Sequence, residues 1–175
     1  MFLKANPDLA AQTMLCTAPS KTFNLAGRQT SNIWIPGEAA REKFQKERRR
    51  AGLDEVNALG LAACQAAYEQ GGAWLDQCKA YLRGNLDFLR DFLKERLPEI
   101  RLVEPEGTYF AWLDCSGLNL SRKELNDLII YKAKLWLDEG YIFGKQAGQF
   151  QRVVLACPRA TLLEALTRLE RAVHA

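Results

Sequence analysis

The chain has 175 residues, of which 48% are hydrophobic and 26% are charged, values that are ordinary for a soluble globular protein. Its formal net charge of +3 is too small to indicate a nucleic-acid partner. No apolar run approaches the roughly 20 residues that a membrane-spanning helix needs, so we expect no membrane association.

The cysteine and histidine content argues against several kinds of site. The five cysteines are far apart and form no C-x-x-C pair, so we expect no metal site. The single histidine, His174, is next to last, and a frayed terminus is a poor place for a general base. The first residues do not read as a secretion signal, and we therefore predict a cytoplasmic protein with reduced thiols.

Hydrophobic periodicity and the placement of Gly and Pro predict alternating strands and helices. Ser121 with Glu124 fits a capping box, and Thr161 with Glu164 is a second candidate. The helix after Ser121 is expected to carry an apolar face that ends at Trp136. The alternation predicts the α/β class, with helices packed on a small sheet. The expected elements are a buried strand over 13–17, a strand over 31–35, helices over 38–50, 57–69 (largely buried) and 73–97, strands over 100–103, 108–114, 141–143 and 152–156, and a final helix from 161.

The segment 17–27, Thr-Ala-Pro-Ser-Lys-Thr-Phe-Asn-Leu-Ala-Gly, places Lys21 in a turn of small residues directly after a predicted strand. A lysine amine held in this way can form a Schiff base with an aldehyde cofactor. The hydroxyl groups of Ser20 and Thr17 could donate hydrogen bonds to a phosphate, and their alternative role is turn capping.

This segment resembles the cofactor-lysine segment of pyridoxal 5'-phosphate (PLP) enzymes with the aminotransferase class I/II fold, also called fold type I. More narrowly, it is similar to the MalY/PatB group of cystathionine β-lyase-like C–S lyases. The resemblance covers about residues 13–172. It implies that Lys21 binds PLP, that the substrate is a small amino acid, and that the complete enzyme is a homodimer.

Two arginines are candidates for binding anionic groups. Arg152 lies in the segment 148–159, which resembles the family segment whose arginine binds the substrate α-carboxylate. A planar guanidinium suits a carboxylate because it can donate two parallel hydrogen bonds, although a salt bridge near a sheet edge is the alternative. Many relatives place a phosphate-binding arginine eight residues after the lysine, where this chain has Gln29. Arg28 therefore either reaches the phosphate by a shifted route or lies on the surface.

The resemblance also implies that the chain is the carboxyl half of such an enzyme. Residues 1–74 would be the remainder of the large PLP-binding domain, and residues 75–175 the small carboxyl-terminal domain. The rest of the cofactor site belongs to the family's amino-terminal half. Without neighbours, the strands over 13–17 and 31–35 would expose unpaired edges, so we expect the isolated chain to need a partner or to be poorly ordered over its first fifty residues.

The function that the resemblance implies is PLP-dependent C–S β-lyase activity. Such an enzyme performs α,β-elimination on a cysteine S-conjugate and releases thiol, pyruvate and ammonia. Two alternatives stay open. One is a PLP-dependent aminotransferase, and the other is a non-catalytic fragment or binding module that has lost the cofactor.

Overall fold

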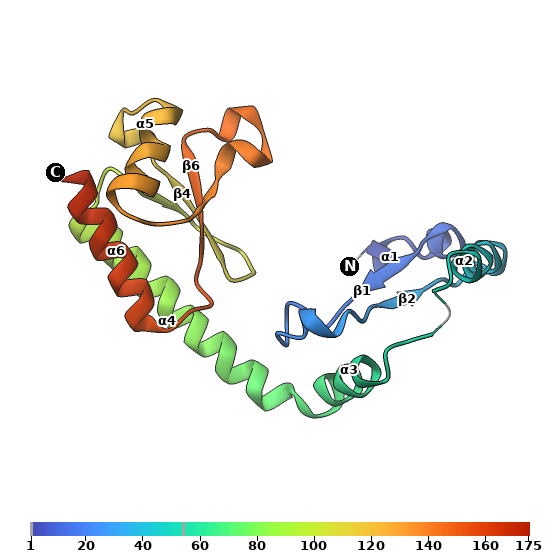
Figure 1. The fold of residues 1–175 in the computed structure, drawn as a ribbon. Helices are drawn as coiled ribbons and strands as arrows, with labels where there is room; N and C mark the ends of the chain where they lie inside the picture. Colours follow the sequence, from blue (N-terminus) through green and yellow to red (C-terminus); the bar gives the residue numbers. More distant parts are fainter. Residues whose placement is uncertain (1, 54) are drawn as a thin grey trace. The chain divides into compact units, whose positions relative to one another are not determined.

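The computed structural model describes residues 2–53 and 55–175, apart from the side chain of Phe2. The chain divides into two compact units, Met1–Gln77 and Cys78–Ala175. Helices and strands are mixed in both units (Figure 1), as the α/β prediction requires. Within the described residues, no helix combines the length and apolarity needed to cross a membrane.

The first unit contains a two-stranded antiparallel sheet, formed by β1 (Leu15–Thr17) and β2 (Asn32–Trp34). Cys16 of β1 pairs with Ile33 of β2. The expectation that the first strand is buried is wrong: every residue of both strands is exposed. Two short strands are too few to bury a face of their own. The other elements of this unit are α1 (Phe2–Ala5), η1 (Pro7–Gln12), η2 (Ala26–Arg28), α2 (Glu38–Arg50) and α3 (Ala58–Gln70).

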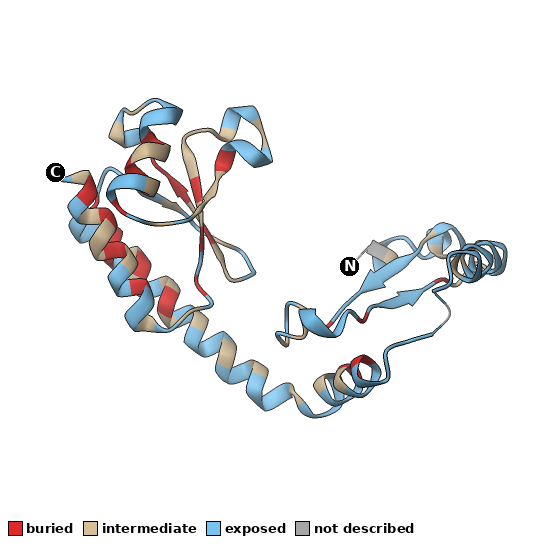
Figure 2. Cartoon of the chain, viewed as in Figure 1, coloured by how far each residue is buried: buried red, intermediate tan, exposed pale blue. Residues whose placement is uncertain are grey.

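Helix α3 begins at a side-chain cap. The Oδ1 atom of Asn57 accepts hydrogen bonds from the backbone N–H groups of Leu59 at 3.0 Å and Gly60 at 3.3 Å. The expectation that this helix is largely buried is wrong. Among the described residues of α3, only Gly60 and Cys64 are buried, and Leu59 is 65% exposed (Figure 2). An alanine- and leucine-rich composition permits burial, but burial also needs a partner surface.

The second unit is built on a four-stranded sheet with the spatial order β3-β4-β6-β5, in which all neighbours are antiparallel. Its long helix, α4 (Gly72–Arg96), begins in the first unit and continues into the second. The other elements are β3 (Arg101–Val103), β4 (Phe110–Asp114), η3 (Ser116–Leu118), α5 (Arg122–Asp127), the π-helical η4 (Leu128–Lys132), β5 (Asp138–Glu139), η5 (Gly140–Phe143), η6 (Lys145–Ala147), β6 (Phe150–Val154) and α6 (Arg159–Val173).

The core of the second unit packs one face of this sheet against the helices (Figure 2). Leu113 of β4 and Val153 of β6 point into the core, and Leu89 of α4 is fully buried there. Because side chains alternate along a strand, Trp112 and Arg152 lie on the opposite face, where the two residues are cross-strand partners. The sheet therefore has a packed face and a second face that is free to carry a site.

A buried amide fixes the connection from β6 to α6. The Nδ2 atom of Asn85 donates to the carbonyl oxygens of Leu155 at 2.8 Å and Cys157 at 2.9 Å. Its Oδ1 atom accepts a hydrogen bond from Nε of Arg159 at 2.8 Å, and the hydroxyl oxygen of Tyr81 accepts one from the Arg159 backbone at 2.7 Å. Asn85 is completely buried, so these bonds replace those that its amide would make to water.

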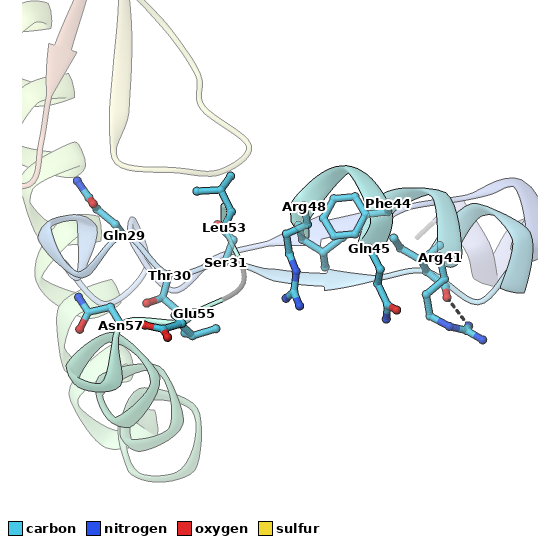
Figure 3. A pocket seen from close by; sticks show the side chains of 13 residues that line it. Gln29, Thr30, Ser31, Arg41, Phe44, Gln45, Arg48, Leu53, Glu55 and Asn57 are labelled. Carbon is cyan, nitrogen blue, oxygen red and sulfur yellow. Dashed lines mark hydrogen bonds between the residues drawn. The ribbon is translucent and has the colours of Figure 1, made fainter. Parts of the chain in front are cut away.

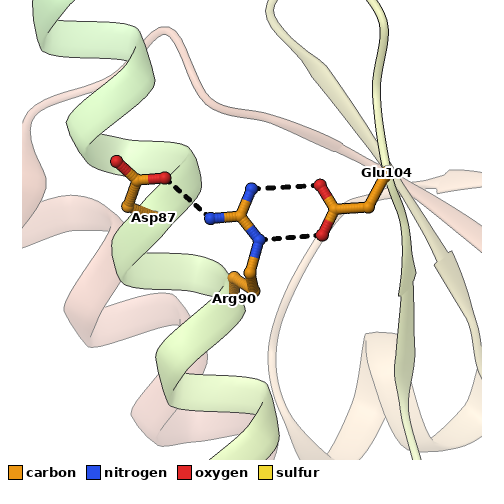
Figure 4. A network of polar contacts seen from close by, with 3 residues as sticks. All are labelled: Asp87, Arg90 and Glu104. Atoms are coloured by element: carbon orange, nitrogen blue, oxygen red, sulfur yellow. Dashed lines mark hydrogen bonds and ion pairs between the residues drawn. The ribbon is translucent and has the colours of Figure 1, made fainter.

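An exposed network joins α4 to the residue that follows β3 (Figure 4). Arg90 donates from Nε and Nη2 to Oε1 and Oε2 of Glu104 at 2.8 and 3.0 Å, and from Nη1 to Oδ1 of Asp87 at 2.7 Å. The hydrogen bond from Arg90 is the main cause that lowers the pKa of Glu104. Since all three side chains are reached by solvent, the network adds little stability.

The first capping box is confirmed, but the helix after it differs from the prediction. Ser121 Oγ accepts from the Glu124 backbone at 3.3 Å, and Glu124 Oε2 accepts from the Ser121 backbone at 2.8 Å. The α-helical turns end at Asp127 and continue as the π-helical segment η4. Trp136 follows this segment and is 89% exposed, so it does not extend the apolar face.

Two other predictions are wrong. Residues 141–143 are not a strand but part of the 3-10 turn η5, and the edge strand β5 lies just before them at Asp138–Glu139. Thr161 is not a helix cap either, because α6 already begins at Arg159. Pro158 takes the N-cap position in an extended conformation (φ −56°, ψ 142°), which places Thr161 inside the helix.

Candidate functional site

Lys21 lies in a hydrogen-bonded turn that directly follows β1. The backbone N–H of Phe23 donates to the Pro19 carbonyl at 2.9 Å, and that of Leu25 donates to the Ser20 carbonyl at 3.0 Å. Pro19 is buried and Ser20 is half-buried, whereas Lys21 is exposed. The turn therefore anchors its first residue and presents the lysine amine to solvent.

An aromatic contact fixes the other side of this turn. The ring of Phe23 lies 5.9 Å from Tyr68 in an edge-to-face arrangement and 6.2 Å from Trp74. Phe23 also packs on Gly71, the residue between α3 and α4. The position of Lys21 thus depends on residues about fifty positions later in the sequence.

The other predicted residues of the first unit flank the Lys21 turn. Thr17 is the last residue of β1 and is exposed. Arg28 ends η2, and its carbonyl oxygen accepts hydrogen bonds from Thr30 Oγ1 at 3.1 Å and Asn57 Nδ2 at 3.5 Å. Its side chain is exposed, and within the described residues its guanidinium makes no hydrogen bond or ion pair. The structure thus fixes the backbone of Arg28 and leaves its guanidinium in solvent.

The donor set around Lys21 suits a phosphate-bearing aldehyde. Lys21 supplies a primary amine, Ser20 and Thr17 supply hydroxyl donors, and Arg28 supplies a cation on the segment that follows. An amine binds an aldehyde covalently, and hydroxyl and guanidinium groups bind phosphate. These residues are chemically able to hold such a group.

Arg152 is the predicted site residue of the second unit, and three neighbouring side chains contact its guanidinium. Its Nε and Nη2 atoms both donate to Oδ2 of Asp138, at 3.0 and 2.6 Å. The centre of its guanidinium lies 4.2 Å from the Phe110 ring centroid and 4.7 Å from that of Phe143. Arg152 therefore makes an ion pair and two cation–π contacts on the face of the sheet that lies away from the core.

Sequence reasoning missed Asp138, Phe110 and Phe143 as partners of Arg152. A strand assignment of 108–114 could have put Phe110 on the same face as Trp112, because their spacing is two. No local signal marks Asp138, since it becomes a neighbour of Arg152 only through the β5–β6 pairing. Those two strands come together around the turns of η5 and η6.

A separate hollow of about 420 Å³ lies in the first unit (Figure 3). Arg41 borders it and donates from Nη1 to the Ile35 carbonyl at 2.9 Å. Among the described residues that line this hollow, none is Thr17, Lys21 or Arg28. The predicted residues Thr17, Lys21 and Arg28 therefore do not contribute to this hollow. Its lining includes Gln29, Thr30, Arg41, Phe44, Arg48 and Glu55.

No model of a known protein family matches the chain. Among curated proteins, cystathionine β-lyase PatB of Bacillus subtilis (strain 168) is 38% identical over 172 residues, which are 98% of this chain and 44% of PatB. Protein MalY of Escherichia coli (strain K12) is 33% identical over 162 residues, 92% of this chain and 42% of MalY. The chain thus spans less than half the length of the curated relatives that it matches.

A solved structure is similar to this chain in fold as well as in sequence. Cystalysin from Treponema denticola, whose crystal structure contains a PLP cofactor, is 38% identical and superposes with a TM-score of 0.94. The match covers 99% of this chain and 44% of cystalysin. The described fold is accordingly that of part of a PLP-dependent, aminotransferase-like protein.

Proposed function

We propose that this chain, a homologue of the MalY/PatB cystathionine β-lyases, carries the cofactor lysine and the carboxylate-binding arginine of a PLP-dependent C–S β-lyase. The observation that carries the proposal is the Lys21 turn. A matching sequence, a hydrogen-bonded backbone and an exposed amine coincide at this one residue. Whole-chain similarity to proteins of this group supports the same reading.

In the proposed reaction, Lys21 holds the cofactor and moves a proton. When bound, PLP supplies an electron sink for negative charge that develops at the substrate Cα. With the cofactor bound, the Lys21 amine would accept the Cα proton as a general base. The hydroxyls of Ser20 and Thr17 would donate hydrogen bonds to the cofactor phosphate, and Ser20 is the better candidate because it adjoins Lys21.

Arg152 is proposed to bind the α-carboxylate of the amino-acid substrate. A guanidinium keeps its charge at every physiological pH and binds a carboxylate through two parallel hydrogen bonds. This bidentate binding orients the bonds at the substrate Cα, and their orientation determines which bond breaks. Arg28 is the weakest of the assigned residues, because its guanidinium is exposed. To bind the phosphate, Arg28 would have to reach it from the surface.

The proposed overall reaction is α,β-elimination on a cysteine S-conjugate. The Cα proton passes to Lys21, and the sulfur leaves Cβ with its bonding electrons and is protonated to the thiol. The 2-aminoacrylate that is released hydrolyses to pyruvate and ammonia. An aminotransferase would instead convert its amino acid to the corresponding keto acid, and the amount of keto acid would equal the amount of amino-group acceptor consumed.

The division of the structure into Met1–Gln77 and Cys78–Ala175 supports a two-domain assignment. We assign residues 1–74 to the remainder of the large PLP-binding domain and residues 75–175 to the small carboxyl-terminal domain. We further propose that the complete enzyme is a cytoplasmic homodimer. Sedimentation of the protein that contains this chain would test the dimer, because a monomer at micromolar concentration would contradict it.

Reduction of a PLP-treated sample with borohydride tests the proposed function. We expect peptide mapping to find the phosphopyridoxyl group on the peptide that contains Lys21. Lys21→Ala should remove both this label and the visible absorbance of the PLP-treated protein. Lys43→Ala, which changes an exposed lysine of α2, is the matched control and should leave both unchanged. A label on another lysine, or no label, would contradict the proposal and favour a non-catalytic fragment.

Product analysis then separates the two PLP reactions. With an S-alkyl cysteine as the substrate, a lyase yields pyruvate and thiol without an acceptor. A keto acid that retains the sulfur, formed only when an acceptor is added, would identify an aminotransferase instead.

A further inference from the structure

The guanidinium of Arg152 is engaged along only one of its two usable edges. Its Nε and Nη2 atoms share Oδ2 of Asp138 as an acceptor. A guanidinium has five N–H donors, and those of Nη1 together with the outer N–H of Nη2 form a second, end-on edge. Among the described residues, this edge has no hydrogen-bond partner. The structure therefore leaves free the edge that suits a second carboxylate.

Two aromatic rings lie against the same guanidinium. Phe110 and Phe143 lie 4.2 and 4.7 Å from its centre. Phe143, which is 51% exposed, also contacts Trp112 edge-to-face at 5.4 Å. Because Asp138 occupies the side-on edge, the end-on edge is the hydrogen-bonding edge of the guanidinium that is left for an anion among the described residues.

The backbone of the sheet imposes this arrangement. Asp138 and Arg152 are direct cross-strand partners in the β5–β6 ladder, where opposed side chains lie close together. Their side chains are 39% and 28% exposed, so the pair is neither sealed from solvent nor free to rotate in it. A carboxylate that approaches from solvent meets an oriented guanidinium.

We propose that Asp138 is a positioning residue, which holds the side-on edge of Arg152 so that the end-on edge receives the carboxylate of an amino-acid substrate. The inference rests on the proposed role of Arg152. Asp138 remains bound to Arg152 when the carboxylate arrives, and the three groups form a row of carboxylate, guanidinium and carboxylate. Asp138 thereby removes in advance the rotational freedom that carboxylate binding would otherwise have to restrict.

Asp138 has two opposing effects on an incoming carboxylate, and a test must separate them. Its charge repels the second anion, whereas its hydrogen bonds orient the guanidinium. Asp138→Asn removes the charge and keeps an amide oxygen that can accept from Nε and Nη2. Asp138→Ala removes the charge and the acceptor together. Comparing these two variants therefore isolates the positioning effect.

The experiment uses ¹⁵N-labelled chain and acetate as the carboxylate probe, with chloride at equal ionic strength as the control. The side-chain N–H signals of Arg152 are assigned by their loss in Arg152→Lys. We expect acetate to shift the Nη signals of the unsubstituted chain and to leave its Nε–H signal in place. The dissociation constant for acetate should be about fivefold higher in Asp138→Ala than in Asp138→Asn, because one more side chain has to be immobilised. Equal urea midpoints of the two variants establish that both are folded.

Two outcomes would overturn the positioning role alone. If acetate moved the Nε–H signal of the unsubstituted chain to its position in Asp138→Ala, the ligand would be displacing Asp138. If Asp138→Ala bound acetate as tightly as Asp138→Asn, the orienting bonds would have no effect. A third outcome, in which acetate moves no Arg152 signal, would instead remove the carboxylate-binding role of Arg152 in the proposed function, and this inference with it.

Discussion

Phe23 and Gly71 are in such close contact that a Cβ added at residue 71 would lie 2.6 Å from Cε1 of Phe23. The glycine is needed for space and not for backbone conformation, because its φ of −78° is open to any residue. Phe23 lies two residues after Lys21, so this contact ties the lysine turn to the junction of α3 and α4. The proposed chemistry of Lys21 therefore depends on a glycine that carries no functional group.

We expect Gly71→Ala to destabilise the first unit by about 1–3 kcal/mol, because the added methyl group would clash with the Ala67 carbonyl oxygen and with the Phe23 ring. Urea unfolding followed by tryptophan fluorescence measures the effect. Gly72→Ala is the matched control, since a Cβ at that neighbouring position meets nothing within 4 Å. Equal stability of the two variants would show that the Phe23 contact does not restrain the turn.

The buried Asn85 amide should be among the most sensitive positions of the second unit. Asn85→Ala removes the bonds to the Leu155 and Cys157 carbonyl oxygens and to Nε of Arg159, of which the Leu155 carbonyl alone keeps a second bond, from the Cys157 backbone. We expect a loss of about 2–3 kcal/mol in the free energy of unfolding. Arg90→Ala, which removes an exposed network on the same helix, should cost less than about 1 kcal/mol. The reverse order, measured by urea unfolding, would contradict this account of the β6–α6 connection.

Asp114 should make the second unit sensitive to acid. Hydrogen bonds from Ser116, followed by the ion pair with Arg101, lower the pKa of Asp114 below its usual value of 3.8. Because the pKa is lower in the folded state, the stabilisation is present above the unfolded-state pKa and is lost as the pH falls through the folded-state pKa.

Asp114→Asn tests this dependence. We expect the variant to be less stable than the unsubstituted chain at about pH 6, and the difference to shrink towards about pH 3. Urea midpoints at both pH values provide the measurement. A difference that stays constant with pH would mean that the charge of Asp114 does not contribute.

Hydrogen exchange should differ between the two sheets. The strands β1 and β2 are exposed on both faces, whereas β4 and β6 contribute core residues such as Leu113 and Val153. Because protection follows burial and local stability, we expect amides of the two-stranded sheet to exchange at least about tenfold faster. Uniform strong protection from residue 10 onward, measured by NMR or mass spectrometry, would contradict the expectation that the isolated chain needs a partner or is poorly ordered over its first fifty residues.

The sequence predicted the secondary structure best where a local signal was strong. The predicted ends of the helix over 38–50 and of the long helix over 73–97 agree with the structure to within one residue. Both helices are indicated by the charge pattern or apolar spacing of a single continuous segment. Burial was predicted less well. The apolar strand over 13–17 and the alanine-rich α3 are exposed, since burial is a property of neighbouring surfaces and not of one segment.

By itself the sequence determined the α/β class, the Lys21 segment and the similarity to PLP-dependent C–S lyases, and it led to the proposal that Arg152 binds a carboxylate. All of these reside in contiguous strings, where residue type and spacing are visible directly. Only the tertiary structure decided that Phe23 packs on Gly71 and that Asp138 and Arg152 form a pair flanked by Phe110 and Phe143. These contacts join residues from different elements, and strand register and helix packing set them, neither of which a local pattern encodes.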